Sequence, residues 1–146
     1  WSMNGQKGFQ PGIISLSGVS FDLKFECIEN AINESEWLPG GCVLHRKENL
    51  ITNDYYPFKG KAYAEDLIHS ILLRENGVRL YLCEGAISYF DKPDGAEKLS
   101  DFFKQYKAAK YVAVLANKKL IRIKIYYFLN FIYWFLKKII WLKKYF

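Results

Sequence analysis

The stretch GKAYAEDLIHSILLRENG (Gly60–Gly77) is the part of the chain that most clearly decides its fold. Two adjacent carboxylates, Glu65 and Asp66, open a run whose apolar residues recur at helical spacing: Leu67, Ile68, Ile71 and Leu72. Asn76-Gly77 is a helix stop signal. We therefore expect the pair on the first turn of a helix, where free N–H groups and the helix dipole stabilise negative charge. There the pair can accept a proton, hold a cation or simply cap the helix.

Charge is distributed unevenly along the 146 residues. Residues 1–101 contain 10 Lys/Arg and 15 Asp/Glu, a net charge of −5, whereas residues 102–146 contain 11 Lys/Arg and no acid, a net charge of +11. Apolar residues make up 51% of the chain, which argues against global disorder and supplies material for one core. The sequence therefore predicts a mildly acidic globular body followed by a basic, apolar tail.

The cysteines are Cys27, Cys42 and Cys83, an odd number without C-x-x-C spacing. Only His45 and His69 could join them, so a structural zinc site has little support. The first residues show neither the basic nor the apolar region of a signal peptide. We expect reduced thiols, packed as small core residues in a cytosolic setting.

Several short elements are expected before the tail. In chain order they are a strand at 13–16, a turn at 37–41, a strand at 42–45, a helical turn at 46–51, the helix after the acidic pair, strands at 78–82 and 86–90, a turn at 91–95 and a helix at 96–117. The candidate packing residues of this last helix are Leu99, Phe102, Phe103, Tyr106 and Tyr111. This mixture predicts an α/β body (residues 1–95) followed by helices.

The tail, residues 118–146, has the pattern of a membrane-surface helix. Its longest uncharged run, Ile125–Leu136, is 12 residues, short of the roughly 20 that a spanning helix needs. On a helical wheel most of its cations fall within about a third of the circumference; these are Lys118, Lys119, Arg122, Lys137, Lys143 and Lys144. Lys124 and Lys138 fall outside that sector. The pattern favours a helix lying in the interface of an anionic membrane over a buried helix or an RNA-binding helix.

The body carries an ordered series of motifs. They are Trp37-Leu38-Pro39-Gly40-Gly41, Arg46, Tyr63-Ala64-Glu65-Asp66, Gly77 and Glu84-Gly85-Ala86, preceded by Pro11-Gly12-Ile13-Ile14-Ser15-Leu16-Ser17-Gly18. This series, over about residues 9–91, resembles the C-terminal half of the catalytic domain in family 2 glycosyltransferases, the inverting enzymes of GT-A fold. The resemblance implies a partial GT-A fold that lacks the N-terminal nucleotide-binding half.

The resemblance also implies roles for particular residues. Asp66 would be the general base that takes the proton from the acceptor hydroxyl, and Glu65 would orient the loop or contact the acceptor. Gly40 and Gly41 would let backbone approach the sugar, and Trp37 would form an apolar wall. Arg46 would contact the substrate, although a lone arginine after a strand is more often part of a structural ion pair.

Two features depart from the family pattern. The Asp-x-Asp motif that holds the nucleotide and its divalent metal (Mg or Mn) does not occur, because the acidic pair Glu34-Ser35-Glu36 lies in the wrong place. Phe90 stands where many relatives have a histidine. We therefore identify no metal ligand in this chain and expect it to be inactive alone.

The leading hypothesis is a bacterial glycosyltransferase part in cell-surface polysaccharide synthesis, peripheral at the cytoplasmic face of the membrane. Its partners would be a nucleotide-sugar donor, a saccharide or lipid-linked acceptor and an anionic membrane surface, with no nucleic acid. The alternatives are a non-catalytic membrane-binding module and a small basic RNA-binding protein. The second alternative is disfavoured because the basic residues are concentrated in the apolar tail.

Overall fold

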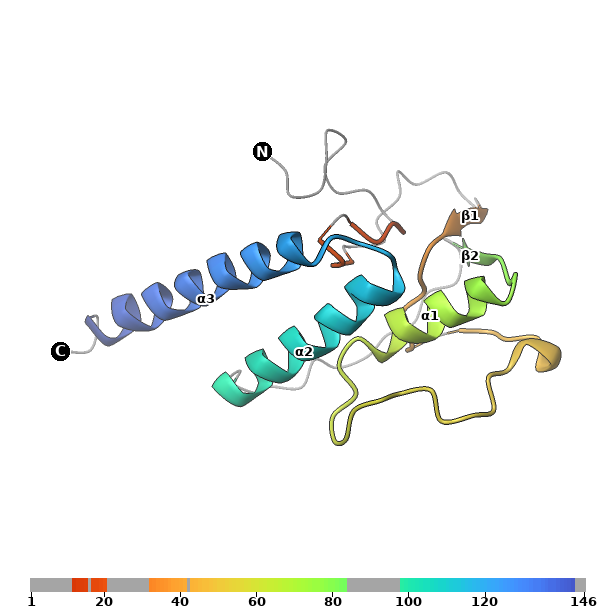
Figure 1. Cartoon of the computed structure of the whole chain (residues 1–146), viewed down its shortest axis with the longest axis horizontal. Helices are drawn as coiled ribbons and strands as arrows, with labels where there is room; N and C mark the ends of the chain where they lie inside the picture. The colour runs from red at the N-terminus through yellow and green to blue at the C-terminus, as the bar shows by residue number, and fades with distance from the viewer. Residues whose placement is uncertain (1–11, 16, 21–31, 42, 84–97, 144–146) are drawn as a thin grey trace.

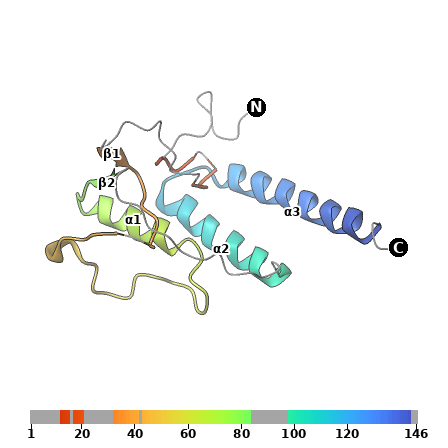
Figure 2. The ribbon, with the colours of Figure 1, turned by 180° about the vertical axis from the view of Figure 1, so that it is seen from behind.

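The computed structural model describes residues 12–15, 17–20, 32–41, 43–83 and 98–143, with side chains in the last range up to residue 137. In chain order the elements are β1 (Ile32–Ser35), a 3₁₀ turn (Lys47–Asn49), α1 (Glu65–Glu75), β2 (Leu80–Cys83), α2 (Leu99–Leu115) and α3 (Leu120–Lys143). The protein is a mixed α/β structure in which a small antiparallel sheet lies beside α1 (Figure 1). Both ribbon views place α2 between α1 and α3 (Figure 2).

Helix α1 begins and ends where the sequence predicts. Ala64, in the left-handed conformation (φ 54°), precedes it, and Glu65 and Asp66 form its first turn. At the other end Asn76 donates its backbone and side-chain N–H groups to the carbonyl of Leu72. Gly77 has φ +80°, a left-handed conformation that glycine adopts without a Cβ penalty. The predicted helix and its stop signal are confirmed.

The sheet consists of β1 and β2 in antiparallel pairing, with Ser35 opposite Leu80 and Glu34 opposite Tyr81. Beside it, the guanidinium of Arg79 lies 3.4 Å from the Glu34 carboxylate. Ser35 and Leu80 are buried at the end of the sheet next to the core, whereas Ile32 at the other end is exposed. Among the residues that the structure describes, the sheet joins the core at its Ser35–Leu80 end.

The core is built around one face of α1. The buried residues of its main cluster are Ile14, Trp37, Leu67, Ile68, Ile71 and Val112. A second cluster, Ala109, Ala113 and Ile123, joins α2 to α3. Gly18, at φ +74°, crosses α2 so closely that a Cβ at this position would lie 2.9 Å from the Cβ of Ala113. Small residues on α2 thus permit the close approach of a loop and a second helix.

Two expectations about regular structure need correction, and one strand was not predicted. Residues 13–16 were expected to form a strand, but among the described residues Ile14 makes only an isolated bridge to Ser20. The strand expected at 42–45 is absent from its described part, because residues 43–46 have no regular structure. Strand β1 was not expected, since its sequence INES has little apolar character. Pairing with β2 stabilises it.

Two expectations about packing were also wrong. Cys83 is exposed, because it ends β2 opposite the exposed Ile32. Leu99 and Phe103 of α2 are exposed as well, and the buried face of this helix consists of Ala108, Ala109, Val112 and Ala113. Phe102, Tyr106 and Tyr111 do pack against other residues, as expected. The buried contacts of α2, however, are made by its small side chains.

Other expectations fall on residues outside the described ranges. These are Cys27, Cys42, the Glu84-Gly85-Ala86 segment, the strand expected at 86–90 with Phe90, and the turn at 91–95. The predicted helical turn is present as Lys47–Asn49, and β2 begins two residues later than the strand predicted at 78–82.

Candidate functional site

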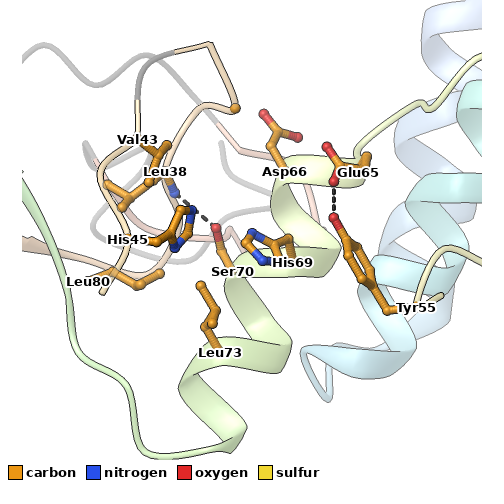
Figure 3. Close-up of a pocket in the computed structure, with 11 residues that line it drawn as sticks. Leu38, Val43, His45, Tyr55, Glu65, Asp66, His69, Ser70, Leu73 and Leu80 are labelled. Carbon is orange, nitrogen blue, oxygen red and sulfur yellow. Dashed lines mark hydrogen bonds between the residues drawn. The ribbon is translucent and has the colours of Figure 1, made fainter. Parts of the chain in front are cut away.

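A cavity of about 250 Å³ opens at the N-terminal end of α1. Helix α1 contributes Glu65, Asp66, His69, Ser70 and Leu73 to its lining. The other lining residues come from the segments on either side, and they are Leu38, Gly40, Val43, His45, Tyr55 and Leu80 (Figure 3). The cavity is smaller than the roughly 300–1,000 Å³ typical of sites for drug-sized ligands. It therefore has room for one small polar group, such as a single sugar ring.

The two carboxylates of the acidic pair have different surroundings. The Tyr55 hydroxyl donates a hydrogen bond to Oε1 of Glu65, so this carboxylate is held at the side of the cavity (Figure 3). The Asp66 side chain points away from that of Glu65 (Figure 3). It lies against the loop that contains Gly40. A Cβ at Gly40 would lie 3.8 Å from the Asp66 Cβ, so the loop backbone passes directly over this residue.

The charge of Asp66 is controlled by burial and by backbone donors. Desolvation raises the pKa of Asp66 above its ordinary value, and the charge of Glu65 raises it further. The backbone N–H groups of Leu67 and Gly40 oppose this shift because they favour the ionised form. The Leu67 N–H donates to Oδ1 of Asp66 at 2.9 Å. The result is a half-buried carboxylate that binds a proton more tightly than a solvated aspartate.

Three rings contact one another in series beside the acidic pair. Tyr55 stacks on His69 with ring centroids 5.2 Å apart, and His69 meets the edge of His45 at 5.1 Å. Burial lowers the pKa of His69, the neighbouring His45 lowers it further, and Glu65 opposes the shift. His69 is therefore biased toward the neutral form. Burial and the bond to Glu65 raise the pKa of Tyr55, so its hydroxyl remains a donor.

The loop over the cavity is fixed to α1 by a buried serine. The Leu38 N–H donates to Oγ of Ser70 at 3.1 Å. On the other side of the loop, the Ser35 hydroxyl bonds the carbonyl of Trp37. These bonds hold Gly40 next to the acidic pair, and they explain why a serine occupies a buried position of α1.

The structure brings together some of the residues that the sequence singled out. Asp66, Glu65 and Gly40 line one cavity, and Gly41 lies beside it on the exposed part of the loop. Trp37 is buried in the core against α1 and does not line the cavity. Arg46 is exposed, precedes the 3₁₀ turn and also lies outside the lining. Trp37 thus supports the loop from beneath.

The sequence reasoning missed Tyr55, His45 and His69 as lining residues. A signal for His69 was present, since residues four apart on a helix share one face and His69 follows Glu65 by four. Tyr55 lies in an aromatic loop with no spacing rule to link it to Glu65. His45 was considered only as a zinc ligand. The two histidines approach each other only because the loop folds back on α1.

The chemistry available to the cavity is proton transfer and hydrogen bonding. In the described ranges, no three His, Cys, Asp or Glu side chains are grouped so that they could hold a metal ion. The divalent metal implied by the family resemblance thus has no group of three such ligands among the described residues. The cavity can accept a hydroxyl group, with Asp66 as acceptor and two further polar groups nearby.

Comparisons with family models, with curated proteins and with solved structures find no match for this chain.

Proposed function

We propose that the chain is the acceptor-side part of an inverting glycosyltransferase of GT-A fold, with Asp66 as its general base. One observation carries this proposal: Asp66 lies in the cavity under the Gly40 loop, while Tyr55 holds Glu65 aside. A carboxylate that only caps a helix would need neither a cavity nor different surroundings for Glu65 and Asp66.

In the proposed reaction, Asp66 accepts the proton of an acceptor hydroxyl. The hydroxyl oxygen then forms a bond to the anomeric carbon of the donor sugar, and the bond from this carbon to the nucleoside diphosphate breaks. Attack opposite the leaving group inverts the configuration. The raised pKa of Asp66 makes its ionised carboxylate a stronger base than that of a solvated aspartate.

Other residues of the cavity would orient the acceptor. Glu65, fixed by Tyr55, is a rigid hydrogen-bond acceptor for a second sugar hydroxyl. Gly40 would let the loop backbone approach the sugar, with Gly41 next to it. Trp37 would act indirectly by supporting this loop, and Arg46 would act only through a substrate that extends beyond the cavity.

The donor would be a nucleotide sugar, held with its divalent metal by a nucleotide-binding part that carries the Asp-x-Asp motif. These 146 residues do not contain that motif. The proposal therefore expects no transfer from residues 1–146 alone and assigns them acceptor binding and deprotonation. The acceptor would be a saccharide or a lipid-linked saccharide.

Helix α3 would hold this part against the membrane surface. No helix in the described part of the chain is both long enough and apolar enough to cross a membrane. The exposed side of α3 nevertheless carries a continuous apolar stripe, formed by Ile121, Ile125, Phe128, Leu129, Ile132, Phe135 and Leu136. With Arg122 and Lys124 beside this stripe, the helix suits a position in the interface of an anionic membrane. We place the protein peripherally, at the cytoplasmic face.

The catalytic proposal is tested with a protein in which this chain is joined to its nucleotide-binding part. Asp66→Asn keeps the size and hydrogen-bonding capacity of the side chain but removes its basicity. We expect turnover to fall roughly 10²–10⁴-fold with donor affinity nearly unchanged. The matched control, Glu65→Gln, should cost less turnover and raise the KM for the acceptor.

Near-normal turnover of Asp66→Asn would contradict the assignment of the base. The favoured function would then be a non-catalytic membrane-binding module, because the apolar stripe of α3 does not depend on Asp66.

A further inference from the structure

An aromatic groove of about 430 Å³ lies between α2 and α3. Helix α2 contributes Phe102, Phe103 and Tyr106 to its walls, and α3 contributes Tyr127, Phe128 and Phe131. The remaining lining residue is Lys124. Nearly all the atoms that line the groove are apolar, so it offers a hydrocarbon surface with one cation beside it.

Contacts between rings fix the two walls. Phe102 meets Tyr127 and Phe131 with ring centroids 5.5 and 5.8 Å apart, and Tyr106 meets Tyr127 at 5.1 Å. Phe103 and Phe128 lie at the edges, where 55% and 63% of their surfaces are exposed. The interior of the groove is thus formed by packed rings, whereas its edges present apolar surface that no described residue covers.

Cations surround this apolar surface. Lys124 lines the groove, and the Lys110 ammonium lies 5.7 Å from the centre of the Tyr106 ring. Residues 102–146 contain no acid, and Asp101 in the first turn of α2 is the acid nearest to them in the sequence. The groove therefore complements a molecule that has a hydrocarbon chain and an anionic head.

Two other occupants fit less well. A second copy of the chain would bring a further segment with 11 cations and no acid against the first, so like charges would meet. A sugar would find few polar groups for its hydroxyls, which must be hydrogen-bonded when they are buried. Hydrocarbon requires no such partners.

We propose that this groove binds one acyl chain of an anionic membrane phospholipid, with its phosphate beside Lys124. Phe128 belongs both to the groove and to the apolar stripe of α3, so a chain can pass from a bilayer under the stripe into the groove. Binding in the groove differs from adsorption of the helix to a membrane surface because the groove holds a single lipid. This proposal does not depend on the transferase reaction.

The test uses the purified full chain and single-chain phosphatidylglycerol below its critical micelle concentration. Titration calorimetry should show saturable binding of one lipid per chain. Lipid with bromine atoms on its acyl chain should quench Trp134, which stacks on Phe131 at 6.3 Å. This part of the quenching should disappear in Trp134→Phe. A single-chain lipid with a neutral, zwitterionic headgroup should bind roughly tenfold more weakly.

Matched variants separate the groove from the rest of the surface. Lys124→Glu should weaken the binding of the single-chain lipid roughly tenfold, whereas Lys137→Glu, the same change outside the lining, should alter it less than twofold. Phe103→Gln should weaken it severalfold, and Leu129→Gln on the stripe should leave it unchanged. All four side chains are exposed, so the variants keep the fold.

Three results would overturn the proposal. One is partitioning without saturation, and another is an equal effect of Lys124→Glu and Lys137→Glu. The third is a dimer in sedimentation that Phe103→Gln dissociates while no lipid binds, since a second copy would then occupy the groove.

Discussion

Helices α1 and α3 are both rich in apolar residues, yet the apolar face of α1 is buried and that of α3 is exposed. In α1, five of 11 residues are buried, and the loops and α2 cover them. Helix α3 has 24 residues, and among its described side chains only Ile123 is buried. The apolar face of α1 is satisfied within the chain, whereas that of α3 requires something outside the described structure. An apolar pattern therefore predicts that a helix face is covered, but it does not identify the element or partner that covers it.

The strongest test of this comparison is to truncate one isoleucine in each helix. Ile68 is fully buried, so Ile68→Ala leaves a cavity and should lower the free energy of unfolding by about 2–5 kcal/mol. Ile132 is exposed, and Ile132→Ala should change the free energy of unfolding by about 0.5 kcal/mol or less. Urea denaturation followed by circular dichroism measures both. Equal losses would mean that α3 is covered within the folded chain.

The second test asks whether a membrane covers α3. Ile132→Gln should weaken binding to phosphatidylglycerol vesicles roughly tenfold, because part of a large apolar side chain no longer enters the interface. Leu50→Gln, an exposed leucine on the globular body, is the control and should have no effect. Binding of the unaltered chain should also weaken with salt, by about 1 kcal/mol for each engaged cation.

If binding to vesicles is independent of salt and reversed only by detergent, the interfacial position is wrong. Deep insertion of α3 would then be the better explanation.

A smaller effect on stability is expected from the residues that precede α1 and α3. Ala64 before α1 and Asn117 before α3 both adopt the left-handed conformation, with φ 54° and 52°. This conformation strains alanine but suits asparagine. Ala64→Gly should therefore raise the free energy of unfolding by roughly 0.5–1 kcal/mol, measured as a higher Tm. Asn117→Gly should leave the Tm nearly unchanged, and an equal rise in both variants would refute the explanation.

The smallest expected effect is the pH dependence that Asp66 gives to stability. Its folded pKa is raised by burial, so the folded state binds the proton more tightly than the unfolded state. The stability from this group is fully present below the unfolded pKa of about 3.8 and is lost as pH rises through the raised folded pKa. Asp66→Asn should remove this loss and be slightly more stable than the original chain at neutral pH.

Denaturation at pH 3 and pH 7 measures this difference. A variant that is less stable than the original chain at pH 7 would show that the ionised carboxylate stabilises the fold. Asp66 would then act mainly as a cap.

The elements that depend on local interactions could be predicted from the sequence. Helix α1, its acidic first turn and its Asn76-Gly77 stop follow from periodicity and backbone preference, and the charge asymmetry of the tail is a matter of composition. These features involve residues within a few positions of one another, so they could be predicted without knowledge of the fold.

Which distant residues contact each other depends on the path of the folded chain. Strand β1 has no apolar pattern and depends on β2, and Trp37 is in the core because the chain passes over α1. Glu65 and Asp66 are neighbours, yet Tyr55 and the Gly40 loop, which lie 10 and 26 positions away, give them different surroundings. Hydrogen bonds and burial across such separations depend on the path of the whole chain, which no local spacing encodes.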